Sequence, residues 1–197
     1  RILNNTAIKC FFVIVLMALT TGNASAQEWY NSYSKSVDGD SFFINTGIGF
    51  GPTGNYDNGI PPISASLDYK LPVKLPITAG LITTFSTWKW SFNNPSTGKI
   101  DVTYTNFGIG ARGMYHFNFW EKTDVYAGLT LGWVFQSSKS KTSSPAGINE
   151  YSDEGKPFFL FGASVGARYF FTSFLGAYLE LGYSGLQILG AGLTLKF

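Results

Sequence analysis

Apolar residues alternate with small or polar residues through most of this chain. In the last stretch, 189–197, every second residue is apolar and the residues between them are glycine, threonine or lysine. Side chains on a β-strand point alternately to its two faces, so the pattern predicts a strand with one apolar face and one small or polar face. A lone strand of this kind has an open hydrogen-bonding edge and must pair with others.

Seven further segments repeat the alternation, which predicts eight strands and no helix. They cover residues 42–50, 63–70, 77–86, 107–117, 125–135, 161–169 and 177–184. The apolar positions change phase between Tyr104 and Phe107, which we interpret as a β-bulge or the top of a long hairpin. The sequence around the Gly-Ala-Arg segment at 110–112 is weakly similar to that around the second one at 166–168. Any regular set of hairpins produces a weak repeat of this kind.

The connections between these segments alternate in length. Long polar connections are expected at 51–59, 91–99 and 136–157, and short ones at 71–76, 118–124 and 171–175. In an antiparallel up-and-down barrel with an even number of strands and both termini on one side, long connections alternate with short ones in this way. The tight last connection, 184–187, departs from it. The predicted fold is therefore all-β, an eight-stranded antiparallel up-and-down barrel.

Composition indicates which face of the barrel looks outward. An eight-stranded barrel is only just wide enough inside for side chains, which suits the face of glycine, serine and threonine. Charged residues are only 13% of the chain, too few to cover a water-exposed outer face, and aromatic residues are 17%. The apolar face is therefore predicted to face lipid. Two aromatic belts are expected at the membrane surfaces: Trp88, Trp90 and Trp133 at the loop end, and Tyr115, Trp120 and Tyr169 at the turn end.

The first 26 residues do not show the alternation of the later segments. Arg1 and Lys9 precede and adjoin a ten-residue apolar run, and Ala24-Ser25-Ala26 is a small-x-small cleavage site at Ala24 and Ala26. The run has about half the roughly 20 residues that a spanning helix needs, so it predicts a signal peptide over residues 1–26. A polar leader (27–40) and the barrel (41–197) follow. Without Arg1 and Lys9 the charges balance, which excludes the basic footprint of nucleic-acid binding.

At this point the sequence resembles the small eight-stranded outer-membrane barrels of Gram-negative bacteria, the OmpA/OmpX/OmpW-like group. The features that carry the resemblance are the secretory signal and the final alternating strand that ends on Phe197, with Leu195 and Leu193 before it. The resemblance implies a multi-pass protein in the outer membrane of the cell envelope, in contact with its lipid. It also implies that Phe197, Leu195 and Leu193 form part of the signal read by the barrel-assembly machinery.

Five charged residues have the phase of the inner face. They are Asp68, Lys70, Arg112, Arg168 and Glu180. Buried charges are tolerated only when they are paired, so we expect ion pairs across the lumen. These pairs could form a structural core or a gate, and Glu180 is expected to pair with Arg112 or Arg168.

Three classes of function remain open. The first is a structural or surface-interaction barrel whose loops, chiefly 136–157, meet an extracellular ligand. The second is a small pore or carrier of hydrophobic solutes, like OmpW. The third is a lipid-modifying enzyme, for which His116 is the one candidate base; no serine follows it at the expected spacing, so we predict no catalytic residues. No spacing predicts a metal site, and the glycine-rich stretches precede no helix, so no cofactor is expected.

Overall fold

The computed structural model describes residues 41–51, 59–94, 98–144, 147–184 and 186–197, which all belong to one compact unit, Lys35–Phe197. These residues form nine β-strands. No helix long and apolar enough to cross a membrane occurs among them. The predicted signal peptide and leader lie outside the described residues.

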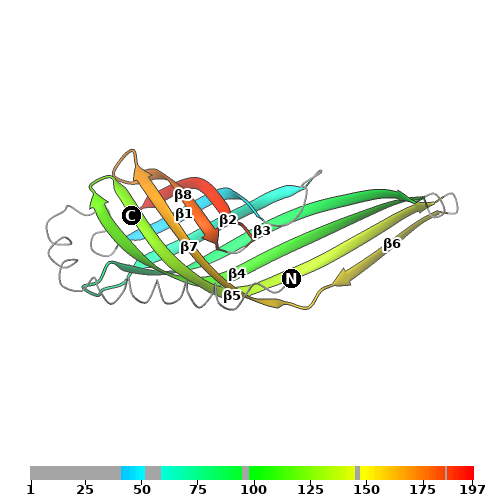
Figure 1. Cartoon of the computed structure of the whole chain (residues 1–197), viewed down its shortest axis with the longest axis horizontal. Coiled ribbons are helices and arrows are strands. Elements are labelled where there is room, and N and C mark those ends of the chain that lie inside the picture. Colours follow the sequence, from blue (N-terminus) through cyan, green and yellow to red (C-terminus); the bar gives the residue numbers. More distant parts are fainter. Residues whose placement is uncertain (1–40, 52–58, 95–97, 145–146, 185) are drawn as a thin grey trace, which may run out of the picture. The chain divides into compact units, whose positions relative to one another are not determined.

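The nine strands form one antiparallel sheet that closes on itself (Figure 1). They are β1 (Phe42–Phe50), β2 (Ile60–Lys70), β3 (Ile77–Asn94), β4 (Gly98–Trp120), β5 (Thr123–Ser144), β6 (Gly147–Glu154), β7 (Phe158–Phe170), β8 (Leu175–Tyr183) and β9 (Leu189–Lys196). β6 pairs with the outer part of β5 and β7 with its inner part, so β6 and β7 together occupy one strand position. The ring therefore has eight strand positions, and the predicted up-and-down barrel is confirmed.

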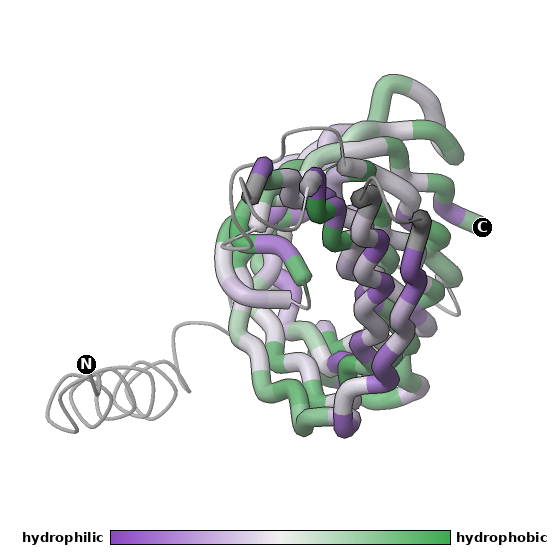
Figure 2. The backbone as a smooth tube through the Cα atoms, turned by 90° about the vertical axis from the view of Figure 1, so that its right-hand side faces the viewer, coloured by the Kyte–Doolittle hydropathy of each residue, from purple (hydrophilic) through white to green (hydrophobic). Residues whose placement is uncertain are grey.

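The first and last strands close the ring. Phe42 and Phe197 exchange two backbone hydrogen bonds of 2.9 Å, and Ile44 lies opposite Leu195. Closure gives every strand position two hydrogen-bonded neighbours, which removes the unpaired edge that lipid does not tolerate. Figure 2 looks along this ring of strands.

The apolar face of each predicted run points away from the lumen. Leu131 is 49% exposed, whereas its neighbour Thr130 is 3% exposed. The other strands show the same alternation, and their exposed apolar residues include Ile44, Ile48, Leu67, Leu81, Ile109, Phe161, Val165, Leu179, Leu181 and Leu193. An outward apolar band of this kind is stable only in lipid, so the strands form a transmembrane barrel.

Glycines on the inner face make room for two tyrosine side chains in the lumen. A Cβ atom at Gly166 would lie 2.4 Å from the Tyr126 ring, and one at Gly47 would lie 2.5 Å from the Tyr178 hydroxyl. Both distances are too short for real contacts, so neither position accepts a larger residue without a shift. The glycine-rich face predicted for the lumen is therefore filled by large side chains from facing strands.

Strands β3 to β6 continue past the apolar band as a four-stranded sheet, which we call the extension (Figure 1). It comprises residues 87–94, 98–105, 137–144 and 147–154. We predicted long loops at 91–99 and 136–157, and this is wrong for most of both segments. Strand pairing continues through them; Lys141, for example, lies opposite Glu150. Polar residues on both faces of β5 and β6 hid these strands from a search for apolar alternation.

The apolar face changes sides between the barrel and the extension. In the barrel β4 exposes Phe107 and Ile109 on the outer face, whereas in the extension Tyr104 lies on the face that continues the lumen wall. Of the two interpretations of the phase change between Tyr104 and Phe107, the bulge is wrong, because the pairing of β4 with both neighbours is continuous there. β3 and β4 do form a long hairpin, but its strands stay paired as far as Asn94 and Gly98. The phase change instead marks where the outer face of the sheet leaves lipid. The irregularity in β4 lies between Phe117 and Trp120.

The residues predicted to form aromatic belts lie on both faces of the sheet. Trp133, Trp120 and Tyr169 are 50–61% exposed, and Tyr115 contacts Phe117 on the outer face of β4. Trp88 and Trp90 instead have the phase of the lumen wall, and Trp88 stacks on Tyr104 with ring centroids 4.0 Å apart. These two tryptophans therefore lie on the inner face of the extension rather than in a lipid-facing belt.

Candidate functional site: the lumen ion-pair cluster

All five charged residues predicted to face the lumen lie inside the barrel. They are Asp68 and Lys70 on β2, Arg112 on β4, Arg168 on β7 and Glu180 on β8, each at most 7% exposed. Outward apolar residues flank them in sequence, so the pleat of each strand turns the charged side chain inward. Four of the five meet in one cluster, and Lys70 does not.

Asp68 is the centre of this cluster. Arg112 donates to both of its carboxylate oxygens, from Nε at 2.7 Å and from Nη2 at 2.5 Å. Arg168 Nη2 donates to Asp68 Oδ2 at 3.1 Å, and Asn45 Nδ2 donates to the same oxygen at 2.9 Å. Ser66 accepts further hydrogen bonds from Arg112 and Asn45, both at 2.8 Å. One carboxylate is therefore shared by two guanidinium groups.

Glu180 contacts Arg112 rather than Arg168. Its Oε2 atom accepts from Arg112 Nη1 at 3.4 Å and from the Tyr126 hydroxyl at 3.0 Å. Although β7 and β8 are neighbours, Glu180 lies opposite Gly166, and the Arg168 side chain extends across the lumen instead.

Arg168 is held by charges and by aromatic rings. Its Nη1 atom donates to Asp124 Oδ2 at 2.9 Å, and Nη2 reaches Asp68. The guanidinium carbon lies 4.6 Å from the ring centres of both Phe43 and Tyr126. Stacking of this kind contributes cation–π attraction, and Arg168 is 0% exposed, so its guanidinium group is held on four sides.

Asp124 is a member of the cluster that sequence reasoning missed. We had assigned it to the turn 118–124, but it lies in β5, one residue past its start, and is 0% exposed. It has the inward phase of Tyr126, two residues later, and this phase was the available signal. Its carboxylate joins Arg168 to His116.

His116 lies between Asp124 and a threonine from the neighbouring strand. Its Nδ1 atom is 2.8 Å from Asp124 Oδ1, and its Nε2 atom is 2.9 Å from Thr78 Oγ1. Because a carboxylate only accepts hydrogen bonds, Nδ1 carries the proton and donates it. In catalytic triads a hydroxyl, an imidazole and a carboxylate are hydrogen-bonded in this order, and the imidazole acts as the base that activates the hydroxyl as a nucleophile. Here all three side chains are 0–1% exposed, so the hydroxyl is not accessible to lipid or solvent.

Lys70 is buried near the turn after β2 and binds the backbone. Its Nζ atom donates to the carbonyl oxygens of Leu71 at 2.7 Å and Val73 at 3.1 Å. Among the described residues Lys70 has no carboxylate within ion-pair distance, so it stabilises the turn and does not belong to the cluster. We had expected it to form an ion pair.

The cluster as a whole contains three carboxylates and two guanidinium groups. Moving a charge out of water costs several kcal/mol, and the cost is offset only where each charge has partners. Two buried polar atoms of the cluster, Arg168 Nε and Glu180 Oε1, have no hydrogen-bond partner among the residues that the structure describes. No group of three or more His, Cys, Asp or Glu side chains in the described part of the chain is placed to hold a metal ion.

The chain combines a closed ring of eight strands, an outward apolar band and a polar, filled interior. It is a small outer-membrane-type β-barrel. Neither protein-family models nor curated proteins match it. Among solved structures it is similar to the attachment invasion locus protein Ail of Yersinia pestis, at 15% identity over 80% of this chain and 95% of Ail, with a TM-score of 0.40.

Two further structures of Ail are similar to this barrel. One is Ail with the heparin analogue sucrose octasulfate, at 17% identity over 80% of this chain and 95% of Ail, with a TM-score of 0.40. The other is the backbone structure of Ail in a phospholipid bilayer nanodisc, at 16% identity over 81% of this chain and all of Ail, with a TM-score of 0.42. The assignment to small outer-membrane barrels rests on the closed ring and its two faces.

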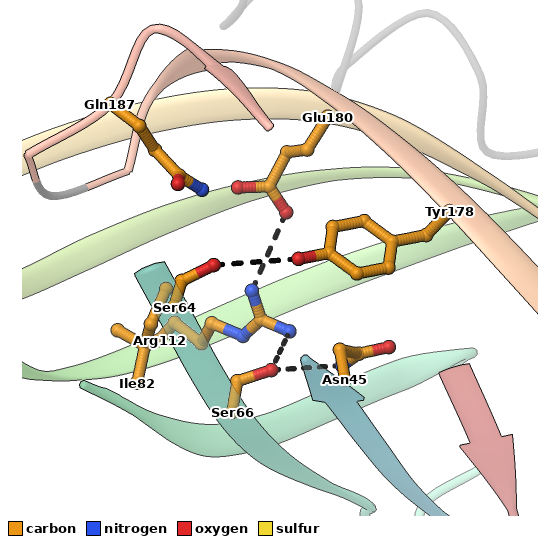
Figure 3. A pocket seen from close by; sticks show the side chains of 8 residues that line it. All are labelled: Asn45, Ser64, Ser66, Ile82, Arg112, Tyr178, Glu180 and Gln187. Atoms are coloured by element: carbon orange, nitrogen blue, oxygen red, sulfur yellow. Dashed lines mark hydrogen bonds and ion pairs between the residues drawn. The ribbon is translucent and has the colours of Figure 1, made fainter. Parts of the chain in front are cut away.

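Above the cluster, on the side of the extension, the barrel holds a cavity of about 10 Å³ (Figure 3). Glu180 and Gln187 are among the residues that line it, and an oxygen atom of each, Oε1, is buried without a partner. A space of this volume accommodates about one water molecule. Leu186, beside Gln187, packs on Val134 and Leu160. Polar contacts of the cluster and apolar contacts of Leu186 therefore both lie in the lumen.

Proposed function

We propose that this barrel acts at the cell surface, where the extension contacts other molecules, and that its lumen is a structural core rather than a channel. The observation that carries the proposal is the extension itself. β4 and β5 are 23 and 22 residues long, about twice the 9–11 residues that a membrane strand needs. The excess is ordered, paired sheet placed outside the apolar band.

The open edges of the extension support this role. Among the described residues, β6 pairs only with β5, and β3 has a single neighbour beyond Thr87. Strands with unpaired backbone donors and acceptors along one edge offer a defined surface for contact. The role proposed from sequence for the segment 136–157 is thus carried by the hairpin of β5 and β6 together with β3 and β4.

The experiment compares the whole barrel with a variant whose extension is replaced. In the variant, residues 88–104 and 137–155 each give way to an Asn-Gly turn, which joins paired strands directly. Both proteins are tested for heat-modifiable folding and surface display, and then for adhesion of the displaying cells to coated surfaces and to each other. We expect equal display and loss of adhesion in the variant. Equal adhesion of both would reject the proposal.

The same two proteins test the pore and enzyme alternatives. A pore like that of OmpW would conduct in planar bilayers, whereas we expect no channel from either protein because large side chains and ion pairs fill the lumen. A lipid-modifying enzyme would retain its activity when the extension is removed, since Thr78, His116 and Asp124 remain. We propose no catalytic role for these residues because they are buried.

We also propose two binding partners, the lipid that surrounds the barrel and the machinery that assembles it. The apolar band is proposed to contact outer-membrane lipid. The C-terminal strand, with Leu193 and Phe197 53% and 67% exposed on the outer face, is proposed to be read by the barrel-assembly machinery.

A further inference from the structure

Four lysines lie on the outer face of the extension, the face that continues the lipid-facing surface of the barrel. They are Lys89 on β3, Lys99 on β4, and Lys139 and Lys141 on β5. The two farther from the barrel are paired: Lys99 Nζ lies 3.1 Å from Asp101, and Lys141 Nζ lies 3.0 Å from Glu150. Lys89 and Lys139 are exposed, and neither has a carboxylate within ion-pair distance among the described residues.

The two unpaired lysines share one row across the sheet. Lys89 lies opposite Thr103, and Thr103 lies opposite Lys139. Because neighbouring strands are about 4.8 Å apart, the backbones of the two lysines are separated by about 10 Å. Two flexible lysine side chains at that distance can converge on one group between them, over the Thr103 hydroxyl.

This row lies just beyond the apolar band. Phe85 and Phe135 are the last aromatic residues on the outer face of β3 and β5, at 38% and 46% exposure, and each precedes its lysine by four residues. Four residues rise about 13 Å along a strand, or about 10 Å along the membrane normal at a typical tilt. Lipid headgroups occupy roughly the 5–7 Å next to the hydrocarbon core on each side. A lysine that lays its carbon stem along the sheet brings its ammonium group back to that level.

We propose that Lys89 and Lys139 form a binding site for the phosphate group of a lipid headgroup in the leaflet from which the extension projects. Ammonium groups bind phosphate as point charges, and this pair has no internal counter-ion to displace. Three carboxylates lie one diagonal step from this row: Asp101, two residues from Thr103 on β4, and Glu150 and Glu154, each two residues from Ser152 on β6. Asp101 pairs with Lys99 and Glu150 with Lys141, and none of the three lies within ion-pair distance of Lys89 or Lys139. The phosphate group comes from a lipid rather than from a soluble anion, because the site is continuous with the apolar band that contacts acyl chains.

The site anchors the outer end of the barrel at a defined depth. The interior of the barrel and the surface contacts of the extension are not involved, so this inference does not depend on the proposed function. It also holds whichever membrane surface carries the extension.

The test compares two double variants that remove the same charge. Lys89→Gln/Lys139→Gln removes the proposed site, and Lys99→Gln/Lys141→Gln removes the two lysines that are paired with carboxylates. Each protein is refolded into phosphatidylcholine vesicles that contain either brominated phosphatidate or brominated phosphatidylcholine, and quenching of tryptophan fluorescence gives the relative affinity for the two lipids. All proteins carry Trp120→Phe, which removes the exposed tryptophan at the opposite end of the barrel. Heat-modifiable folding is checked first.

We expect the unmodified lysines to give a preference for phosphatidate that falls about five-fold for each lysine removed from the row, since a lysine near a membrane surface contributes about 1 kcal/mol. The control variant and Lys89→Arg/Lys139→Arg should keep the preference. Equal loss in both glutamine variants would show a diffuse charge effect and overturn the site. Displacement of phosphatidate by millimolar inorganic phosphate would show a soluble-anion site and overturn the lipid assignment.

Discussion

Arg112 reaches Asp68 across an intervening strand because the residue between them is Gly80. Asp68 lies opposite Gly80 on β3, and Gly80 lies opposite Arg112 on β4. A Cβ atom at Gly80 would lie 2.3 Å from Asp68 Oδ1, in the space that the ion pair occupies. The two charges are therefore joined over the bare backbone of β3, and the cluster depends on a residue with no side chain.

The first prediction concerns Asp68, which serves both arginines. Asp68→Asn leaves Arg112 with only Glu180 and Arg168 with only Asp124, and removal of one partner from a buried ion pair costs about 3–5 kcal/mol. The free energy of unfolding, measured by urea titration in lipid vesicles, should fall by about that amount. Asp101→Asn is the matched control, because Asp101 pairs with Lys99 at the exposed outer face. Equal unfolding midpoints for the two variants would show that the cluster is hydrated.

The second prediction tests the direction of the two faces on β5. Leu131→Arg places a charge on the lipid-facing side in mid-strand, which costs roughly 2–4 kcal/mol near the bilayer midplane. The fraction of protein that refolds into vesicles should fall sharply. Thr130→Ser, one residue away and facing the lumen, should refold like the unmodified chain. Similar yields for both variants would contradict the orientation of the barrel.

The alternation of residues was enough to predict the ring and its two faces. Leu131 and Thr130 differ by one position and lie on opposite sides, because a strand has a side-chain period of two. The extension could not be predicted in this way. Around Lys139 the sequence is polar on both faces, and only pairing with neighbouring strands reveals it as sheet.

Sequence reasoning gave the partner of Glu180 as Arg112 or Arg168 and could not choose between them. Alternation placed Glu180 and Arg168 on the inner face, but contacts across a lumen depend on the stagger of strands around the barrel. That stagger brings Glu180 to Arg112 and Arg168 to Asp68. Asp124, by contrast, lies directly opposite Arg168 on the neighbouring strand. The hydroxyl beside His116 comes from Thr78, 38 residues away, so no local motif could show it.

The third prediction concerns Thr78, His116 and Asp124. If this chain of hydrogen bonds is structural, a fluorophosphonate reagent should not label Thr78 in the folded barrel, because the hydroxyl is buried. Thr78→Val, which keeps the shape of the side chain, should lower the free energy of unfolding by about 1 kcal/mol through loss of one hydrogen bond. Labelling of Thr78 that disappears in His116→Phe would instead reveal an accessible nucleophile.

The fourth prediction concerns an aspartate of the extension. The hydrogen bond from Ser91 and the neighbouring Lys99 lower the pKa of Asp101 in the folded protein. A carboxyl group with a lowered pKa stabilises the fold above its unfolded pKa of about 3.9, and this contribution is lost as the pH falls through the folded value. In Ser91→Ala the pKa of Asp101, followed by NMR titration, should rise toward 3.9. No rise would mean that the neighbouring lysines, Lys99 and Lys141, set the pKa of Asp101.

The last prediction concerns Glu180, which lies at the boundary between the cluster and the small cavity. Its Oε2 atom accepts from Arg112 and Tyr126, while Oε1 faces no donor. Glu180→Gln keeps the shape but removes the charge, and Arg112 retains both of its bonds to Asp68. We therefore expect a loss of stability smaller than that of Asp68→Asn, about 1.5–3 kcal/mol for a charged hydrogen bond.

Conductance separates the two roles considered for Glu180. If its charge only completes a structural core, planar bilayers should show no channel from either the unmodified barrel or Glu180→Gln, since Tyr126 and Leu186 still fill the lumen. If the ion pair with Arg112 is a gate, Glu180→Gln should open discrete channels while Glu150→Gln, on the exposed outer face of β6, should not. Openings in Glu180→Gln alone would therefore reject a closed structural lumen and restore the pore as the function of this barrel.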